Sequence, residues 1–218
     1  MSHTVAVMQP YWIPYPGYFR LLAGADTFVV LDDVQFPRRG YVHRNRLEKE
    51  DGELDWLTLP LVKAPRSVKI SDLEFRNDAY DVMQAAREKF PIIRSGYGCI
   101  ASEMNRLEGQ VVPFLVRTLE RFIELLEIET PIILASQILP PSGKDAQSRI
   151  IELVKELGGT EYLNSPGGQD LYEEKAFQDR GLSLRFLEPW NGSYSSILQQ
   201  VGEPSQVERL KRDIINQC

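Results

Sequence analysis

The latter half of the chain alternates between short apolar runs and amphipathic helical patterns, and this alternation limits the possible folds more than any other feature. Each apolar run has the length of a buried strand, and helical spacing of apolar residues separates it from the next. The expected order is strand, helix, strand, helix, strand and two helices, over 131–135, 146–157, 160–164, 170–179, 182–187, 194–201 and 204–216. Strands connected through helices run parallel, so we expect a mostly parallel sheet with helices on both faces.

The first half adds two strands and a segment of different character. Two apolar runs predict buried strands with a short helix between them, over 4–8, 27–31 and 17–24. Between residues 40 and 75 the pattern changes to alternation with turn residues, which predicts an antiparallel excursion with extended runs at 41–47, 56–61 and 68–75. Amphipathic helices should follow over about 78–90 and 109–127. The predicted fold class is α/β: a mostly parallel sheet with helices on both faces and an antiparallel β excursion near residues 40–75.

The length and composition of the chain are those of one globular domain. A chain of 218 residues falls in the usual size range of a single domain, so we expect one domain over residues 1–218. No apolar run approaches the roughly 18 residues that a membrane span needs, so no membrane span is expected. The N-terminal residues lack the pattern of a secretory leader, which favours a cytoplasmic protein.

Charge and metal-ligating residues exclude two broad function classes. A net charge of -6 argues against general nucleic-acid binding, which depends on phosphate neutralisation by lysine and arginine. Two cysteines and two histidines give neither a disulfide framework nor a zinc set. Asp32 and Asp33 could hold Mg²⁺ together with phosphate oxygens, but no third ligand is indicated, so we expect no metal site. The sequence indicates no cofactor.

A local cluster of arginines interrupts this acidic chain. Arg38, Arg39, Arg44 and Arg46 lie beside His43, and no acidic residue lies among them. On an extended strand Arg44 and Arg46 share one face, where two planar guanidinium groups can bind a phosphate or a carboxylate. The alternative is a solvated edge strand that charge protects from aggregation.

Two carboxylates and one histidine are the candidate catalytic groups. Asp32 and Asp33 follow a buried strand, where a carboxylate can accept a hydrogen bond from a substrate hydroxyl or ammonium group and act as a general base. Alternatively, one acid pairs with a nearby arginine and the other caps a turn. His43 is the internal histidine, but a nucleophilic pair with Cys99 or a distant serine is disfavoured, and the alternative is a structural imidazole.

Two loops at predicted strand ends carry candidate substrate-binding residues. In the proline-rich loop after the first strand, Gln9, Tyr11 and Tyr18 are the expected ligand contacts, whereas the other aromatic residues are expected to pack. At the start of the helix near 146, Lys144 and Arg149 could hold an anion together with free backbone amides, unless Asp145 occupies those amides as an N-cap.

Several of these motifs, in this order, resemble the WbqC-like protein family of bacterial polysaccharide clusters. The matching residues are Gln9-Pro10-Tyr11, Gly17-Tyr18-Phe19, Phe28 to Phe36, Arg44-Asn45-Arg46, Arg149-Ile150, Gly167-Gly168 and Tyr172. Near the C-terminus the family tends to have an acid and an asparagine where this chain has Ser196 and Gln200. The resemblance extends the expected substrate-binding set to Gln9, Tyr11, Tyr18, Gln35, Arg44, Asn45, Arg46, Lys144, Arg149, Gly168 and Tyr172.

The resemblance implies a role in the biosynthesis of O-antigen or a related glycan, with transfer of an acyl or aminoacyl group, such as glycine, onto an amino sugar. The partners would be small molecules, a nucleotide sugar and an activated acyl donor. Two alternatives stay open. One is a nucleotidyltransferase-like enzyme, although Tyr15 and Tyr18 stand where that chemistry needs histidines. The other is a non-catalytic accessory protein that binds a nucleotide sugar.

Overall fold

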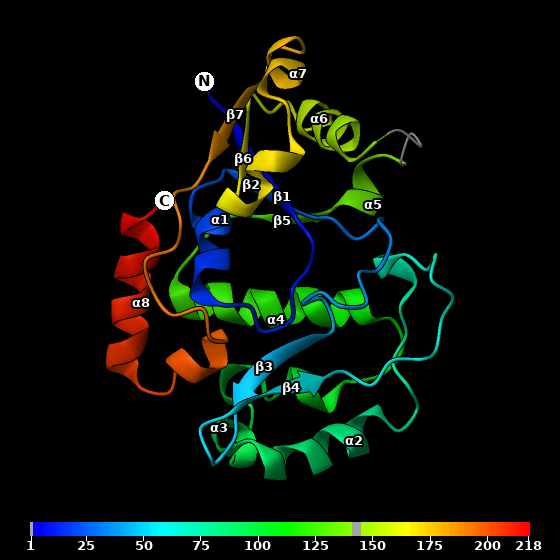
Figure 1. Cartoon of the computed structure of the whole chain (residues 1–218), viewed down its shortest axis with the longest axis vertical. Helices are drawn as coiled ribbons and strands as arrows, with labels where there is room; N and C mark the ends of the chain where they lie inside the picture. The colour runs from blue at the N-terminus through cyan, green and yellow to red at the C-terminus, as the bar shows by residue number, and fades with distance from the viewer. Residues whose placement is uncertain (1, 141–144) are drawn as a thin grey trace.

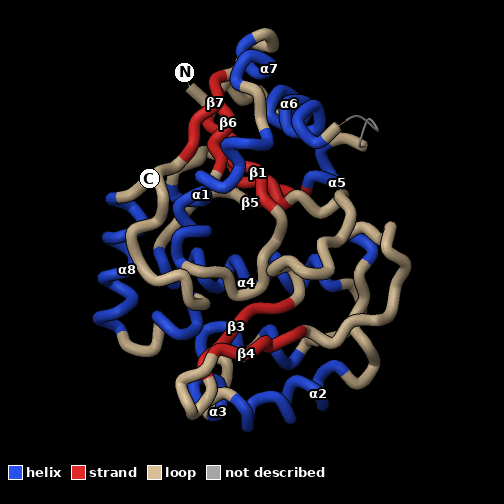
Figure 2. The backbone as a smooth tube through the Cα atoms, viewed as in Figure 1, coloured by secondary structure: helices blue, strands red, loops and turns tan. Residues whose placement is uncertain are grey.

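The computed structural model describes residues 2–140 and 145–218, and the described residues form two separate sheets (Figure 1, Figure 2). The larger sheet has five parallel strands in the order β5-β2-β1-β6-β7. Its strands are β1 (Thr4–Met8), β2 (Thr27–Val30), β5 (Ile132–Leu134), β6 (Glu161–Asn164) and β7 (Ser183–Phe186). The α/β class and the parallel sheet expected from the sequence are confirmed.

The strand order reverses direction between β1 and β6. From β1 the chain moves outwards to β2 and then to β5, and it returns to the other side of β1 to form β6 and β7. β1 therefore pairs with β2 through Val5 and Thr27, and with β6 through Val5 and Tyr162. At such a reversal the connections after the two central strands leave in opposite directions, which opens a crevice at the carboxyl ends of the strands.

Helices cover both faces of this sheet because its strand residues alternate between two apolar clusters. Ala6 and Phe28 belong to the cluster that includes Leu22 and Phe122, whereas Val5 and Val29 belong to the cluster on the other side. On the first face lie α1 (Phe19–Ala23), α4 (Val111–Leu126) and α8 (Pro204–Asn216), and on the second lie α6 (Ala146–Glu156) and α7 (Glu174–Gln178). Within the described residues, none of the helices is both long and apolar enough to cross a membrane.

The antiparallel excursion is a two-stranded hairpin followed by helices. β3 (Arg44–Glu48) pairs with β4 (Leu54–Thr58), and Gly52 adopts a positive φ of 82° in the turn between them. Figure 2 shows this hairpin well separated from the larger sheet. Two short helices follow it, α2 (Ala79–Ala86) and α3 (Pro91–Arg94).

Some expected elements are shorter or absent. The segment 68–75 is not a strand: single bridges join it to three different segments, and it contains a 3-10 turn at Ile70–Asp72. Its first part pairs with the loop after β2, since Ile70 N donates to Val34 O at 3.0 Å, and its end pairs with the residues just after β4, since Val62 N donates to Glu74 O at 2.9 Å. The helix expected over 194–201 is a 3-10 helix at Ile197–Gln200, and a 3-10 helix at Pro166–Leu171 precedes α7.

A buried carboxylate, which no sequence pattern predicted, ties the segment before α4 to that helix. Glu103 is 1% exposed and accepts hydrogen bonds from Arg117 Nε at 2.7 Å and from Arg121 Nε at 3.2 Å. Burial alone would raise the pKa of Glu103, but the hydrogen bonds from Arg117 and Arg121 outweigh burial and hold it below its ordinary value. Glu103 is therefore ionised in the folded protein at neutral pH.

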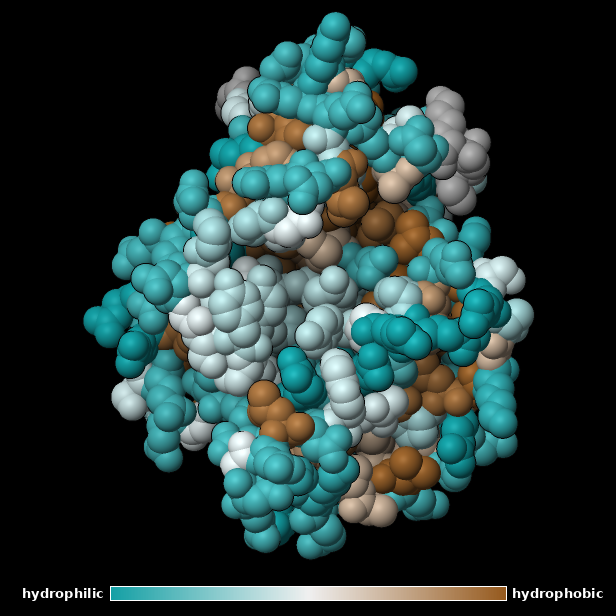
Figure 3. Space-filling view, in the orientation of Figure 1, coloured by the Kyte–Doolittle hydropathy of each residue, from teal (hydrophilic) through white to brown (hydrophobic). Residues whose placement is uncertain are grey.

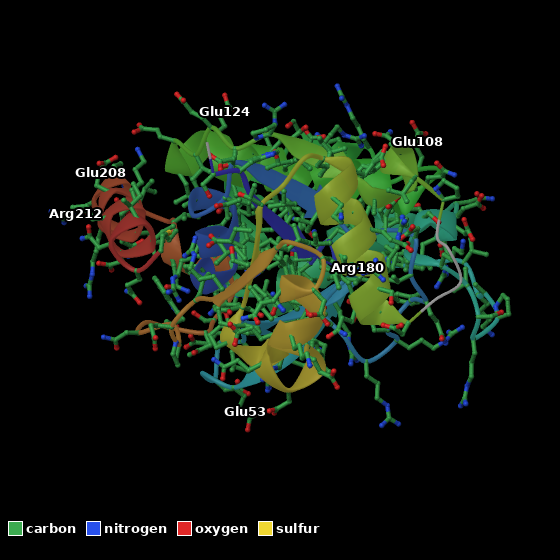
Figure 4. All side chains as sticks on the ribbon, turned by 90° about the horizontal axis from the view of Figure 1, so that it is seen from above. Glu53, Glu108, Glu124, Arg180, Glu208 and Arg212 are labelled. Carbon is green, nitrogen blue, oxygen red and sulfur yellow. The ribbon has the colours of Figure 1, made fainter. Side chains whose placement is uncertain are left out.

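Replacing Glu103 with glutamine should destabilise the fold, because the neutral amide loses the charge that the two guanidinium groups stabilise. Hydrogen bonds to charged groups contribute roughly 1.5–3 kcal/mol, so thermal unfolding should show a Tm about 5 °C lower or more. The matched control is Glu124→Gln, since Glu124 also pairs with Arg121 but lies at the surface (Figure 4). An equal loss of Tm in both variants would contradict the role assigned to Glu103.

Candidate functional site

The carboxyl ends of β1, β6 and β7 open into a pocket of about 320 Å³. Its walls come from residues 8–21 after β1, 165–167 after β6 and 187–194 after β7. This is the place where the strand order reverses, and ligands in open α/β sheets bind at such a reversal. In Figure 3 the face is hollowed near its middle, and the surface beside the hollow is pale, as expected for tyrosine, tryptophan and glycine residues.

A second pocket of about 240 Å³ continues the first one towards the hairpin. The two share Tyr11, Tyr15 and Tyr194, and the second also touches Asn45 and Arg46 of β3. We call the two pockets together the tyrosine cleft. It joins the end of the parallel sheet to the arginine-bearing strand of the hairpin.

The tyrosines of the cleft hold one another in place and stay neutral. Tyr15 and Tyr194 stack with ring centroids 5.0 Å apart, and Tyr11 lies 5.5 Å from Tyr18 and 5.7 Å from Tyr41. Burial raises the pKa of Tyr18 well above its ordinary value, and its hydroxyl donates to Gln9 O at 2.9 Å. Burial also raises the pKa values of Tyr11 and Tyr15. The hydroxyls of Tyr11 and Tyr15 can therefore donate hydrogen bonds to a ligand at neutral pH, whereas the Tyr18 hydroxyl already donates to Gln9 O, and none of the three is a base.

Gly17 allows the aromatic walls to approach the backbone. A Cβ atom at this position would meet a Trp190 side-chain carbon at 2.8 Å and would collide with the ring of Tyr15. Any larger residue would therefore displace two walls of the cleft.

The loop that carries Tyr11 and Tyr15 is fixed by side chains from two distant segments. Ile13 has a φ of 44°, a region that β-branched residues rarely adopt. Its carbonyl oxygen accepts hydrogen bonds from Asn45 Nδ2 at 2.7 Å and from Ser196 Oγ at 2.8 Å, and both donors are buried. Ser196, in the C-terminal motif where this chain departs from the family pattern, thus positions the wall of the cleft.

Arg44 and Arg46 lie on one face of β3, as predicted. Both guanidinium groups lie over the ring of Trp56, 4.0 Å and 5.5 Å from its centroid. Trp56 is the direct cross-strand partner of Arg46. Arg46 is exposed at the rim of the cleft, whereas Arg44 is half-buried and donates to Arg39 O at 3.0 Å. The tryptophan holds the two cations side by side.

The two candidate carboxylates have structural partners. Asp32 is buried and accepts hydrogen bonds from Ser136 N at 2.9 Å and Ser136 Oγ at 2.6 Å, at the start of α5 (Ala135–Ile138). Asp33 is buried against Arg149 of α6 at 2.5 Å, and Arg149 also donates to Leu139 O at 2.7 Å. The arginine that pairs with the acid comes from α6, and neither carboxylate lines the tyrosine cleft.

His43 also lies outside the cleft. Its ring packs edge-on against Phe36, with centroids 4.8 Å apart. Burial, together with the nearby charges of Arg44 and Arg38, lowers the pKa of His43 to about 4. The imidazole is therefore neutral at physiological pH. This contact with Phe36 favours the alternative of a structural imidazole.

The remaining predicted site residues are dispersed. Gln35 is exposed and donates to Arg66 O at 2.7 Å. Gly168 is buried, and a Cβ there would collide with the amide of Asn164. Tyr172 packs with Tyr162 and Phe177 in the cluster on the other face of the sheet. Lys144 lies outside the described residues.

Sequence reasoning missed four of the six aromatic residues that line the cleft, which are Tyr11, Tyr15, Tyr18, Tyr41, Trp190 and Tyr194. Tyr15 was expected to pack under its loop, yet it lines both pockets, and Trp190 and Tyr194 were not singled out. The sequence signal that could have identified Trp190 and Tyr194 is their position shortly after the strand 182–187, because the carboxyl ends of all parallel strands lie at the same edge of the sheet. Across residues 2–140 and 145–218 there is no group of three or more His, Cys, Asp or Glu that could hold a metal ion.

Removing Arg149 should be costly because the Asp33 carboxylate would stay buried without its partner. We expect Arg149→Met to lower the free energy of unfolding by about 3–5 kcal/mol in urea denaturation. The double variant Asp33→Asn, Arg149→Met should recover part of that loss. Arg185→Met, which breaks the more exposed pair with Glu161, is the control and should cost about 1 kcal/mol or less. A loss no larger than in the control would contradict the structural role of the pair.

The pH dependence of stability should reveal the half-buried His43. The unfolded chain takes up a proton at His43 below its ordinary pKa of about 6.5, whereas the folded protein does so only near pH 4. The free energy of unfolding should therefore fall as the pH is lowered from about 6.5 to about 4. His43→Phe should remove this part of the decline, and His3→Gln should retain it. Identical pH profiles for the wild type and His43→Phe would rule out this assignment.

Comparison with known proteins covers nearly all of the chain. The WbqC-like protein family matches residues 9–201, which include the whole tyrosine cleft apart from Met8. The curated protein "Uncharacterized protein Rv1507c" of Mycobacterium tuberculosis is 27% identical over 194 residues, which are 83% of this chain and 79% of that protein. No solved structure matches this chain. Because the family match spans most of the sequence, the chain belongs to the WbqC-like protein family.

Proposed function

We propose that the protein binds a nucleotide sugar in the tyrosine cleft and acts in the biosynthesis of a bacterial cell-surface glycan of the O-antigen type. The reaction proposed is the transfer of an acyl or aminoacyl group, such as glycine, to an amine of the sugar. One observation carries the proposal: the pocket at the strand reversal continues into a pocket lined by tyrosines with Arg46 at its rim.

The lining suits a ligand with a ring and many hydroxyl groups. Aromatic side chains offer flat apolar faces for a sugar or a nucleobase, and their hydroxyls offer hydrogen bonds to its polar edge. The stacked pair of Tyr15 and Tyr194 and the neighbouring Tyr11 supply both. A pocket that is mostly apolar with a few fixed polar groups is typical of small-molecule sites.

Arg44 and Arg46 suit the phosphates of such a ligand. A guanidinium group can form two parallel hydrogen bonds to a phosphate, which a lysine cannot do. Stacking on Trp56 keeps both side chains in place, so less conformational entropy is lost on binding. Arg46 lines the cleft, and Arg44 lies next to it along the same tryptophan ring.

In acyl transfer the amine of the acceptor attacks the acyl carbonyl, and the donor group leaves from the tetrahedral intermediate. The guanidinium of Arg46 and the neutral tyrosine hydroxyls can donate hydrogen bonds to the oxyanion of that intermediate. The described partners of Asp32 and Asp33 do not support either acid as the general base. The amine proton would then pass to solvent, and the protein would act mainly by positioning the two substrates.

A second candidate function is a nucleotide-sugar-binding accessory protein without catalytic activity. The observation that favours it is the lining itself, since neither a carboxylate nor an imidazole is among the residues that line the cleft. A nucleotidyltransferase-like reaction has less support. Tyr15 and Tyr18 replace its histidines, and the Tyr18 hydroxyl is already bonded to Gln9 O.

Binding of nucleotide sugars to the double variant Arg44→Ala, Arg46→Ala tests the proposal. A panel of UDP-, GDP- and dTDP-linked sugars is first screened by thermal shift, and the sugars that stabilise the wild type are then titrated by calorimetry. We expect the affinity of the variant to fall about tenfold or more, because each hydrogen bond to a charged group contributes roughly 1.5–3 kcal/mol.

The matched control is Arg180→Ala, Arg212→Ala. It removes two exposed arginines, Arg180 from the loop after α7 and Arg212 from α8. Unchanged affinity in a folded Arg44→Ala, Arg46→Ala variant, or an equal loss in the control, would overturn the proposed site. With a binding sugar in hand, mass spectrometry after addition of glycine thioester or glycyl ester separates the two candidates: a new amide identifies the transferase, and binding without product identifies the accessory protein.

A further inference from the structure

We propose that a second site, separate from the tyrosine cleft, binds a phosphate or diphosphate group. It is an open pocket of about 580 Å³, lined by residues 35–40 and by Arg66. Three of its lining side chains are arginines, and none is a carboxylate. We call it the arginine pocket.

The charge around this pocket is unusual for an acidic chain. Residues 34–47 and 61–71 contain no aspartate or glutamate, although the whole chain has a net charge of -6. Their lysines and arginines are Arg38, Arg39, Arg44, Arg46, Lys63, Arg66 and Lys69. Among the described residues, the lysines and arginines that form ion pairs all lie outside these two segments. Like charges gathered without counter-charges repel one another, and a bound anion relieves that repulsion.

The pocket is held in shape by hydrogen bonds between its two loops. Phe36 N donates to Val68 O at 2.9 Å, and the Gln35 side chain donates to Arg66 O at 2.7 Å. The guanidinium of Arg38 is fixed by the carbonyl oxygens of Ala64 and Pro65. The walls are therefore formed before a ligand arrives, which lowers the entropic cost of binding.

Arg39 and Arg66 are the two cations that this framework leaves available. Both side chains are exposed, and neither forms an ion pair or a side-chain hydrogen bond with a described residue. Arg38 supplies a fixed charge, and Arg39 and Arg66 can close on a ligand from either side.

Phosphate fits these groups better than other ligands do. Three guanidinium groups around a concave surface can neutralise an anion with two or more charges, and the guanidinium groups of Arg39 and Arg66 can each bind two oxygens of a tetrahedral group. A ligand with a single carboxylate would neutralise only one of the three guanidinium groups. A neutral sugar would neutralise none. A long nucleic acid needs a wider basic surface than this acidic chain has.

The pocket and the cleft lie at opposite ends of one short segment. Arg44, whose guanidinium stacks on Trp56 beside Arg46, also donates to Arg39 O at 3.0 Å. The segment from Arg39 to Arg46 therefore runs from the arginine pocket to the rim of the cleft. If the cleft binds a nucleotide sugar, the pocket takes the phosphate of the co-substrate; that assignment rests on the proposed function, whereas the phosphate site itself does not.

Calorimetric titration with inorganic pyrophosphate at low ionic strength tests the site. The titration uses Arg44→Ala, Arg46→Ala as the parent protein, so that the arginines at the rim of the cleft do not contribute. We expect the parent to bind pyrophosphate, and the added pair Arg39→Ala, Arg66→Ala to weaken binding about tenfold or more. The added pair Arg180→Ala, Arg212→Ala removes the same charge elsewhere and should leave the affinity unchanged.

A second arm identifies the source of the phosphate. Vesicles of phosphatidylglycerol with phosphatidylcholine are sedimented with the same variants, and vesicles of phosphatidylcholine alone are the blank. Dependence on Arg39 and Arg66 with pyrophosphate alone assigns a soluble ligand, and dependence with anionic vesicles assigns a lipid headgroup. If neither probe depends on these arginines, the proposal is overturned. The nucleotide-sugar affinity of Arg39→Ala, Arg66→Ala in the otherwise wild-type protein is measured in parallel. If nucleotide sugars still bind while neither probe depends on Arg39 and Arg66, the phosphate site is wrong and the proposed function stands.

Discussion

The reversal of strand order between β1 and β6 is the constraint on which the rest of the molecule depends. Because the five strands are parallel, all their carboxyl ends lie at one edge, and the reversal separates the connections that leave this edge. The loops after β1, β6 and β7 therefore line one pocket, although the first is more than a hundred residues from the other two in the sequence. The apolar clusters on both faces keep this edge rigid, because the apolar residues of the central strands β1 and β2 pack alternately into the two clusters.

The hairpin of β3 and β4 is separate from the parallel sheet, and its residues Asn45 and Arg46 complete the lining of the cleft. One buried carbonyl group helps to join the two parts: Ile13 O accepts from Asn45 of β3 and from Ser196 near the C-terminus, and Trp12 N also donates to Tyr41 O at 2.9 Å. The left-handed backbone at Ile13 is unfavourable for a β-branched residue, so the two buried hydrogen bonds to Ile13 O must offset its cost. The same contact sets the position of Arg46, which is the next residue on β3. The distance between the tyrosines of the cleft and Arg46 at its rim is thereby fixed by the fold.

Sequence patterns predicted the features that depend on residues close together in the chain. The parallel strands, the helix that Asp145 caps through Ser148 N at 2.9 Å, and the shared face of Arg44 and Arg46 all follow from spacing within a few residues. Tertiary partners could not be read in this way. Asp33 pairs with Arg149 across 116 residues, and nearer arginines were equally plausible from the sequence. The segment 68–75 alternates like a strand, but its backbone partners are single positions in three different segments.

The placement of the acids explains how an acidic chain can keep two sets of arginines open to anions. A carboxylate near Arg46 or Arg39 would compete with a phosphate ligand and would be repelled by it once bound. Asp32 and Asp33 follow the strand next to the cleft, yet both turn towards α5 and α6, where Ser136 binds the carboxylate of Asp32 and Arg149 binds one oxygen of Asp33. Those contacts hold two negative charges away from the cleft. The hydrogen bonds from Ser136 and the ion pair with Arg149 offset the free-energy cost of burying the two carboxylates. The site that remains is neutral in its tyrosines and positive in its arginines, which is the charge that an anionic sugar derivative requires.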